Sequence, residues 1–236
     1  MNRAFIFDVF GTLVDWREGV ATIVGSAFEK HGVIIDAYTF SDAWRARYEP
    51  AMARIRMQGR AYVALDILHR ENLDATLVEF GIENTFGQDE RETLNQSWEK
   101  LLAWTDVHEG LDRLRLLGCV APCSNASIAL SLRLARFAKL NWDSIVGAEI
   151  AQNYKPAREV YISSCNTLGF EPKNVVMVAA HNDDLIAARS AGLQTAFIAR
   201  PREYGEAQTV DLTPTSNWTY VAKDLVHLGE QIEIFG

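Results

Sequence analysis

Four short groups of polar residues along the chain have side chains that could form a nucleophilic catalytic site, and each group lies at or after the end of an apolar run. A buried carboxylate can act as a nucleophile when a lysine beside it keeps it ionised and a second carboxylate orients water. Hydroxyl and amide groups in front of a helix can bind an anion. In chain order the groups are Asp8 with Gly11 and Thr12, Ser124 with Asn125, Lys155 within Asn153–Pro156, and His181 through Asp184.

Each group also has a purely structural explanation. Asp8, Ser124 or Asn125 could cap the helix that follows it, and Asp184 suits the first turn of a helix because of the helix dipole. Lys155 could be an exposed loop residue. Any one group alone favours the structural explanation. All four at the same edge of one sheet favour a catalytic site.

The apolar runs and the segments between them predict the elements that position these groups. Strands are expected at Ala4–Phe7, Cys119–Cys123 (with Pro122 at its end), Ser144–Ala148, Val175–Val178 and Thr195–Ile198. Helices are expected at Glu109–Leu117, Ser127–Leu140, Ala157–Leu168, Asp184–Ala191 and Trp218–Gln231. Strands that alternate with helices predict an α/β fold with a doubly wound parallel sheet, and such sheets bind ligands at the carboxyl ends of their strands.

The segment from residue 16 to residue 100 contains helical patterns and no convincing strand. Helices are expected at Glu18–His31, from Ser41 onward, and at Ala61–Arg70, Ala75–Phe80 and Gln88–Leu102. We therefore predict two domains: an α/β core of residues 1–15 and 101–236, and an inserted all-helical cap of residues 16–100.

Composition limits the class of protein. The chain has 236 residues, of which 48% are hydrophobic, and its net charge is −8. The negative charge argues against nucleic acid or an anionic membrane as a main partner, but it allows a small anionic substrate. No apolar run is long enough to cross a membrane, and no signal peptide is expected. The three cysteines are too few and too irregular for a disulfide framework, which favours the cytoplasm.

In their order, the four groups resemble the haloacid dehalogenase superfamily over nearly the whole chain: Asp8-x-x-Gly11-Thr12, Ser124-Asn125, Lys155-Pro156 and the acidic motif that ends at Asp184. The resemblance implies a Rossmann-like core with a cap. Most members are magnesium-dependent phosphatases, with one further aspartate two residues after the nucleophile and another in a Gly-Asp pair of the last motif. Phe10 and Ala180 occupy these positions here. Neither side chain can bind Mg²⁺, so we expect no metal and no cofactor, and a phosphatase is the alternative.

The pattern is instead similar to the type II L-2-haloacid dehalogenases. The matching features are Phe10-Gly11-Thr12-Leu13, the pair Trp44-Arg45 in the cap, and a tyrosine six residues after the lysine, Tyr161. This resemblance implies a metal-free reaction in which aspartate displaces halide from C2 and water hydrolyses the resulting ester to a 2-hydroxy acid. It also implies a homodimer. A non-catalytic anion-binding protein is a third interpretation, disfavoured because a binding protein needs no nucleophile.

The resemblance implies a role for each matched residue. Asp8 is the nucleophile, and the residues that hold it and position water are Thr12, Lys155 and Asp184. The halide is received by Arg45 and Asn125, and the substrate carboxylate is held by Ser124 with nearby N–H groups. The substrate site is completed by Val9, Phe10, Tyr161 and His181. Two residues depart from the family pattern, since Ala179 replaces a serine and His181 replaces an asparagine. Asn182 takes over the asparagine role if the loop shifts by one residue. We also hypothesise that His181, with Trp16 nearby, narrows the halide site, donates to the ion and favours fluoride.

Overall fold

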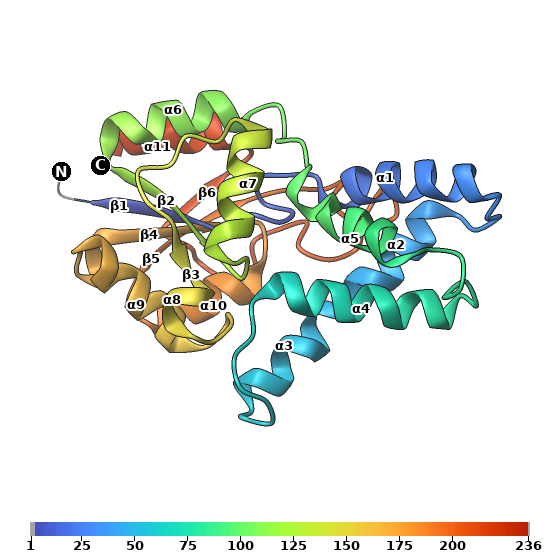
Figure 1. Cartoon of the computed structure of the whole chain (residues 1–236). Coiled ribbons are helices and arrows are strands. Elements are labelled where there is room, and N and C mark those ends of the chain that lie inside the picture. The colour runs from blue at the N-terminus through green and yellow to red at the C-terminus, as the bar shows by residue number, and fades with distance from the viewer. Residues whose placement is uncertain (1–2, 236) are drawn as a thin grey trace.

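The structure is a computed structural model that describes residues 3–235, and it combines a parallel sheet flanked by helices with a helical cap (Figure 1). The strands are β1 Ala4–Phe7, β2 Cys119–Ser124, β3 Val146–Gly147, β4 Val175–Ala179, β5 Gln194–Ile198 and β6 Tyr220–Ala222. Their order in the sheet is β3-β2-β1-β4-β5-β6, and every neighbouring pair is parallel. The predicted α/β fold is confirmed.

β1 lies at the centre of the sheet and is buried on both faces, because its side chains alternate between two hydrophobic clusters. Phe5 and Phe7 belong to one cluster, and Ala4 and Ile6 belong to the other. The first cluster is covered by α6 Val107–Leu117, α7 Ile128–Ala138 and α11 Leu225–Phe235, and the second by α8 Ala148–Ala151, α9 Arg158–Leu168 and α10 Asn182–Ser190 (Figure 1). Burial of each phenylalanine contributes roughly 1.5–3 kcal/mol, which fixes β1 and the residue that follows it.

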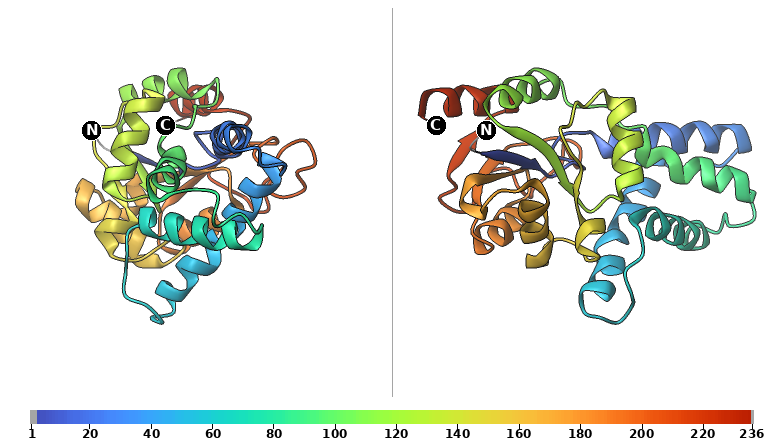
Figure 2. Two further views of the ribbon diagram at one scale, coloured as in Figure 1. Left: turned by 45° about the vertical axis from the view of Figure 1, so that its right-hand side comes forward. Right: turned by 60° about the vertical axis from the view of Figure 1, so that its left-hand side comes forward.

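The cap projects from the edge of the sheet at which β1 ends (Figure 2). It consists of α1 Trp16–His31, α2 Ala37–Ala46, α3 Tyr48–Arg56, α4 Leu65–Glu79 and α5 Gln88–Asn95, followed by the 3-10 turn Gln96–Glu99. Two antiparallel segments join it to the core, since Val14 pairs with Ala103 and the N–H of Asp15 donates to the carbonyl of Leu102 at 3.0 Å. The predicted domain boundaries lie at these segments, and the division itself stays a prediction.

Three predictions about the helices of the cap are wrong. The helix expected to begin at Ser41 begins four residues earlier, because Asp36 caps it by accepting the N–H of Thr39 at 2.7 Å. Ser41 lies inside the helix, where its hydroxyl donates to the carbonyl of Ala37. The two helices expected at Ala61–Arg70 and Ala75–Phe80 are the single helix α4. The helix expected at Gln88–Leu102 is also shorter than predicted, since α5 ends at Asn95.

Three predictions in the core also need correction. The segment expected as the helix Trp218–Gln231 begins with β6, which pairs with the exposed edge of β5, and α11 starts only at Leu225. The strand expected at Ser144–Ala148 is reduced to β3. Pro122 lies inside β2 and not at its end, which is tolerated because β3 pairs only with Cys123 and Ser124, so β2 is an edge strand at the proline.

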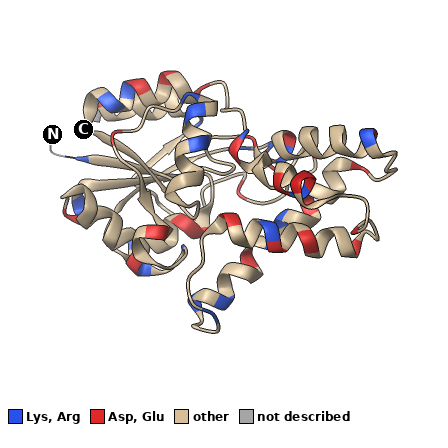
Figure 3. Ribbon diagram, in the orientation of Figure 1, with Lys and Arg blue, Asp and Glu red and all other residues tan. Residues whose placement is uncertain are grey.

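The charged residues of both signs are interspersed on the helices of core and cap (Figure 3). Within residues 3–235, no helix combines the length and the apolar character that crossing a membrane requires.

Candidate active site

Asp8 is the first residue after β1, at the carboxyl edge of the sheet. The chain builds β2 and β3 on one side of β1 and β4 to β6 on the other, so Asp8 lies where the strand order reverses. Its N–H donates to the carbonyl of Val178 in β4 at 3.0 Å, and the residue is only 8% exposed. Ligands of open α/β sheets bind at this kind of position.

Lys155 joins the two carboxylates of the site. Its Nζ lies 2.8 Å from Oδ1 of Asp8 and 2.5 Å from Oδ2 of Asp184. The N–H of Lys155 donates to Oδ1 of Asn125 at 2.8 Å, which fixes the loop between α8 and α9 against the end of β2. The hydroxyl of Tyr161 donates to Oδ1 of Asp184 at 2.6 Å. The predicted convergence of these groups at one sheet edge is therefore present.

These contacts set the charge of each group. Burial raises the pKa of Asp8, but Lys155 and His181 outweigh it and hold that pKa far below its ordinary value. Burial, together with the negative charge of Asp8, raises the pKa of Asp184. Burial lowers the pKa of Lys155, but its two carboxylate partners raise it above the usual value. Asp8 is thus ionised at neutral pH, as a nucleophile must be.

The turn after β1 holds the second oxygen of Asp8. The hydroxyl of Thr12 donates to Oδ2 of Asp8 at 2.8 Å and accepts the N–H of Ala180 at 2.9 Å. The buried Arg200 donates from Nε to the carbonyl of Thr12 at 2.8 Å and forms a bidentate ion pair with Asp106. The turn is therefore fixed from two sides.

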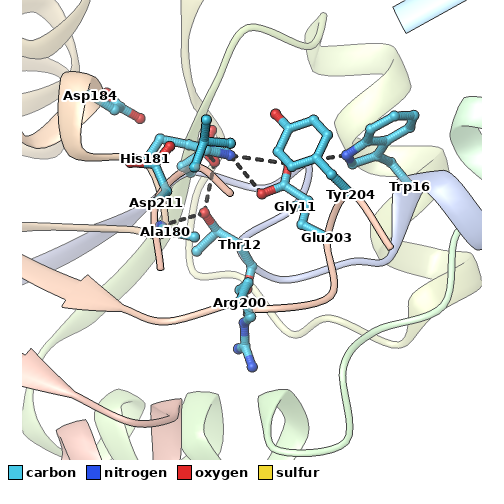
Figure 4. Close-up of polar contacts among 12 residues, drawn as sticks. Gly11, Thr12, Trp16, Ala180, His181, Asp184, Arg200, Glu203, Tyr204 and Asp211 are labelled. Atoms are coloured by element: carbon cyan, nitrogen blue, oxygen red, sulfur yellow. Dashed lines mark hydrogen bonds and ion pairs between the residues drawn. The ribbon is translucent and has the colours of Figure 1, made fainter. Parts of the chain in front are cut away.

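His181 lies inside the site between two carboxylates (Figure 4). Its Nδ1 is 3.1 Å from Oδ2 of Asp8, and its Nε2 is 2.9 Å from Oε2 of Glu203. Trp16 donates from its indole N–H to Oε1 of Glu203 at 3.0 Å. Glu203 is not among the site residues that the sequence predicts. The one signal for it was its place in the loop after the predicted strand Thr195–Ile198, at the same edge of the sheet.

The hypothesis that His181 donates to a halide disagrees with these contacts, because both of its ring nitrogens face carboxylates. The suggestion that Asn182 replaces the family asparagine is also wrong. Its side chain contacts the loop between β5 and β6, where its amide group donates to Asp211 and its oxygen accepts the indole N–H of Trp218.

A cavity of about 590 Å³ separates these groups from the cap. Its lining includes, from the core, Asp8, Phe10, Asn125, Lys155, His181 and Asp184, and from the cap, Trp16, Arg45, Tyr48 and Met52. The guanidinium of Arg45 lies 3.9 Å from the ring centre of Tyr48 and 5.4 Å from that of Trp16. Its Nη1 is buried and has no hydrogen-bond partner among the described residues.

Four of the predicted site residues do not line the cavity. Thr12 and Tyr161 lie behind the two carboxylates that they contact, and Val9 packs in the hydrophobic core. The Ser124 hydroxyl accepts the N–H of Ala126 at 3.1 Å, which is a turn contact within the chain. Substrate binding by Val9 and Ser124 stays a prediction.

The residues around Asp8 also indicate which ligands the site could offer to a metal ion. Phe10 packs edge-to-face on Trp98, with 5.7 Å between ring centres, and brings no oxygen to the site. Within the described chain, no three His, Cys, Asp or Glu side chains form a group that could hold a metal ion. Independence from metals stays a prediction for experiment.

Comparison with known proteins identifies relatives of the whole chain. The family model of haloacid dehalogenase-like hydrolases matches residues 2–192. A curated (S)-2-haloacid dehalogenase 4A from Burkholderia cepacia is 31% identical and aligns over 86% of each chain. A phosphoglycolate phosphatase from Chromobacterium violaceum is 29% identical over 96% of this chain and 97% of its own.

Two crystal structures share the entire fold. The defluorinating L-2-haloacid dehalogenase Rha0230 is 44% identical, with a TM-score of 0.96 over 98% of this chain and 95% of its own. The L-2-haloacid dehalogenase PA0810 is 39% identical, with a TM-score of 0.95 over 99% and 100% of the two chains. The match of the family model over most of the chain and the shared architecture agree with the resemblance seen in the motifs. The chain belongs to the haloacid dehalogenase-like hydrolases.

Proposed function

We propose that this protein hydrolyses short 2-haloacids, such as haloacetates or L-2-haloalkanoates, to 2-hydroxy acids and halide through an ester on Asp8. The observation that carries the proposal is that a buried, ionised Asp8 and a half-buried Arg45, whose Nη1 has no hydrogen-bond partner among the described residues, line the same cavity. The relatives named above as 2-haloacid dehalogenases support it.

Asp8 is the nucleophile of this proposal. Its two oxygens are held by Lys155 on one side and by Thr12 on the other, so the carboxylate presents a fixed lone pair to the cavity. An oxygen of Asp8 bonds to C2 of the substrate, and the halogen leaves with the electrons of its bond. Because the carboxylate is already oriented, little entropy is lost on reaching the reactive geometry.

Arg45 is proposed to receive the leaving halide, with Asn125 beside it on the cavity wall. The Nη1 end of the Arg45 guanidinium is buried, and a charge held away from water is unfavourable without a negative partner. Within residues 3–235, Arg45 forms no ion pair, and its nearest neighbours are the aromatic faces of Tyr48 and Trp16. The negative charge that develops on the halogen supplies the missing partner, so the contact strengthens in the transition state.

Lys155, Asp184 and Tyr161 are proposed to support both steps. Lys155 keeps Asp8 ionised before attack and faces the ester afterwards. Asp184 holds the ammonium of Lys155 in place, and Tyr161 in turn fixes Asp184. Phe10 supplies an apolar wall beside the reacting carbon.

A phosphatase is the second candidate, favoured only by the similarity to a phosphoglycolate phosphatase. Phe10 and Ala180 argue against it, because neither offers an oxygen where a magnesium-dependent phosphatase needs a carboxylate. We further infer a homodimer, from the family resemblance, and a cytoplasmic location, from the three free cysteines.

Halide release with a chelator present tests the proposal. The purified protein, dialysed against EDTA, is given chloroacetate and each enantiomer of 2-chloropropionate, and chloride and the hydroxy acid are measured. We expect stoichiometric chloride and hydroxy acid from chloroacetate and from the L-enantiomer. Phosphate release from phosphate esters with Mg²⁺, without chloride release from any haloacid, would favour the phosphatase instead.

A further inference from the structure

The half-buried His181 and the buried Glu203 form a charge pair, and an ionised nucleophile with Lys155 beside it does not by itself require this pair. Both ring nitrogens of His181 face carboxylate oxygens, Asp8 at 3.1 Å and Glu203 at 2.9 Å. Only the imidazolium form has an N–H on both nitrogens, so the resting ring carries a proton on each. Burial lowers the pKa of His181, but Glu203 and Asp8 raise it well above its ordinary value.

Glu203 is held in one orientation. It is 1% exposed, Trp16 donates to Oε1, and the Cα of Gly11 packs against its carboxylate. Among the described residues its one ion-pair partner is His181. A buried carboxylate that faces no lysine or arginine is unfavourable unless its partner is charged. The pair therefore fixes the direction of the imidazole and, once Nδ1 has lost its proton, the tautomer that keeps its proton on Nε2.

We propose that His181 is the base that takes a proton from the hydrolytic water, and that Glu203 is the positioning residue that orients it. The inference rests on the proposed function, since it concerns the ester formed on Asp8. The Nδ1 atom of His181 contacts the carboxyl group that becomes the ester, so it lies within reach of a water that attacks Cγ.

The protons and charges balance in this scheme. When Asp8 becomes a neutral ester, His181 faces one carboxylate in place of two, and its Nδ1 proton is released to solvent. Water attacks Cγ of Asp8 and passes a proton to Nδ1, which leaves an oxyanion with one hydroxyl group. The bond between Cγ and the ester oxygen breaks, and the hydroxyl proton passes to the departing alkoxide. Each turnover releases one halide and one proton, and Asp8 and His181 regain their charges.

Asp184 is the other carboxylate near the ester, and it is a poorer base. Its Oδ2 already accepts from Lys155 and its Oδ1 from Tyr161, so both oxygens have donors. His181, by contrast, loses a partner when the ester forms. The loss of the negative charge of Asp8 lowers the pKa of the imidazole, and a base with a pKa near the working pH is the most effective one.

Rapid-quench kinetics of Glu203→Gln test this role. Glutamine keeps the size of the side chain, removes its charge, and offers an N–H that favours the His181 tautomer protonated on Nδ1, which cannot accept a proton there. We expect a burst of about one halide per active site, followed by hydrolysis slowed by roughly 10²-fold or more. Intact mass should show one acid-derived group on Asp8. The burst also demonstrates that the variant is folded.

Glu206→Gln is the matched control, because it makes the same change at an exposed position of the same loop, and it should behave as the parent. In His181→Ala, added imidazole should restore hydrolysis without changing the burst. A Glu203→Gln variant whose burst slows as much as its hydrolysis, with no adduct, would overturn the inference. A parent enzyme that releases no halide would instead contradict the proposed function, and the inference with it.

Discussion

The carboxylate of Glu203 packs directly against the Cα of Gly11, so that a Cβ atom on residue 11 would overlap with Oε1. Gly11 also has a φ of +87°, which disfavours any side chain. We expect Gly11→Ala to lower the free energy of unfolding by about 1–3 kcal/mol through backbone strain. It should also displace Glu203 and make the ester on Asp8 accumulate, as measured by quenched mass spectrometry.

Gly32→Ala separates the two effects, because Gly32 has a φ of +67° but a Cβ atom added there would meet nothing within 4 Å. It should lose stability to a similar degree and keep the parent rate of ester hydrolysis. If both variants accumulate ester equally, the contact between Gly11 and Glu203 does not matter for catalysis.

Asp8→Asn should abolish turnover and leave the fold intact, because the amide is a weak nucleophile. In a single turnover of the parent enzyme in ¹⁸O-labelled water, the label should appear first in Asp8, since water attacks Cγ and not C2. Digestion and mass spectrometry of the peptide that contains Asp8 measure this. Label that appears first in the hydroxy acid would mean direct attack by water.

Arg45→Ala should lower kcat by roughly 10²-fold or more, as for other donors that stabilise developing negative charge. The halide burst is the sensitive measurement, because the contact acts when the carbon–halogen bond breaks. Arg47→Ala is the control, since Arg47 pairs with Glu79 on the outside of the cap. An effect of Arg45→Ala confined to KM would assign Arg45 to the substrate carboxylate.

The core of the site was predictable because parallel strands end at one edge of a sheet. Asp8, the loop that carries Lys155 and the helix start that carries Asp184 must meet there once the strand–helix alternation is recognised. The position of Arg45 came from the family resemblance and not from any local pattern. The structure adds that its guanidinium lies on the aromatic face of Tyr48, three residues further along the chain.

The features that the sequence did not predict depend on contacts between segments that are far apart in the chain. Glu203 reaches the site through His181 and Trp16, and no spacing in the chain reports those contacts. The local sequence predicts helix at β6, because β5, the partner that makes this segment a strand, lies elsewhere in the chain. At Ser41 the error was local: Asp36 and Ser41 can each cap a helix, and only the backbone shows that Asp36 does so.

Stability should depend on pH through His181. Its neighbours are Asp8 at the end of β1, Glu203 and Tyr204 from the loop after β5, and Lys155 and Arg45, which line the same cavity. Because its pKa is raised in the folded state above the ordinary 6.5, its stabilising contribution is complete below that pH. The contribution is lost as the pH rises through the folded-state pKa. The free energy of unfolding in urea should therefore differ between the parent and His181→Asn by an amount that decreases as the pH rises. A difference that increases with pH would contradict a charged His181.

Substrates with different halogens distinguish a role of His181 in hydrolysis of the ester from a role in binding the halide. Fluoro-, chloro- and bromoacetate all give the same ester on Asp8, because the halogen has already left. If His181 acts on that ester, His181→Asn should slow its hydrolysis equally whichever substrate formed it. Steady-state turnover should then fall least with fluoroacetate, because the strong carbon–fluorine bond makes the first step slow already in the parent enzyme. Rapid-quench halide release followed by steady-state rates on the three acids measures both steps. A variant that loses fluoride release more than bromide release would return His181 to the halide site, as the sequence-based hypothesis had it.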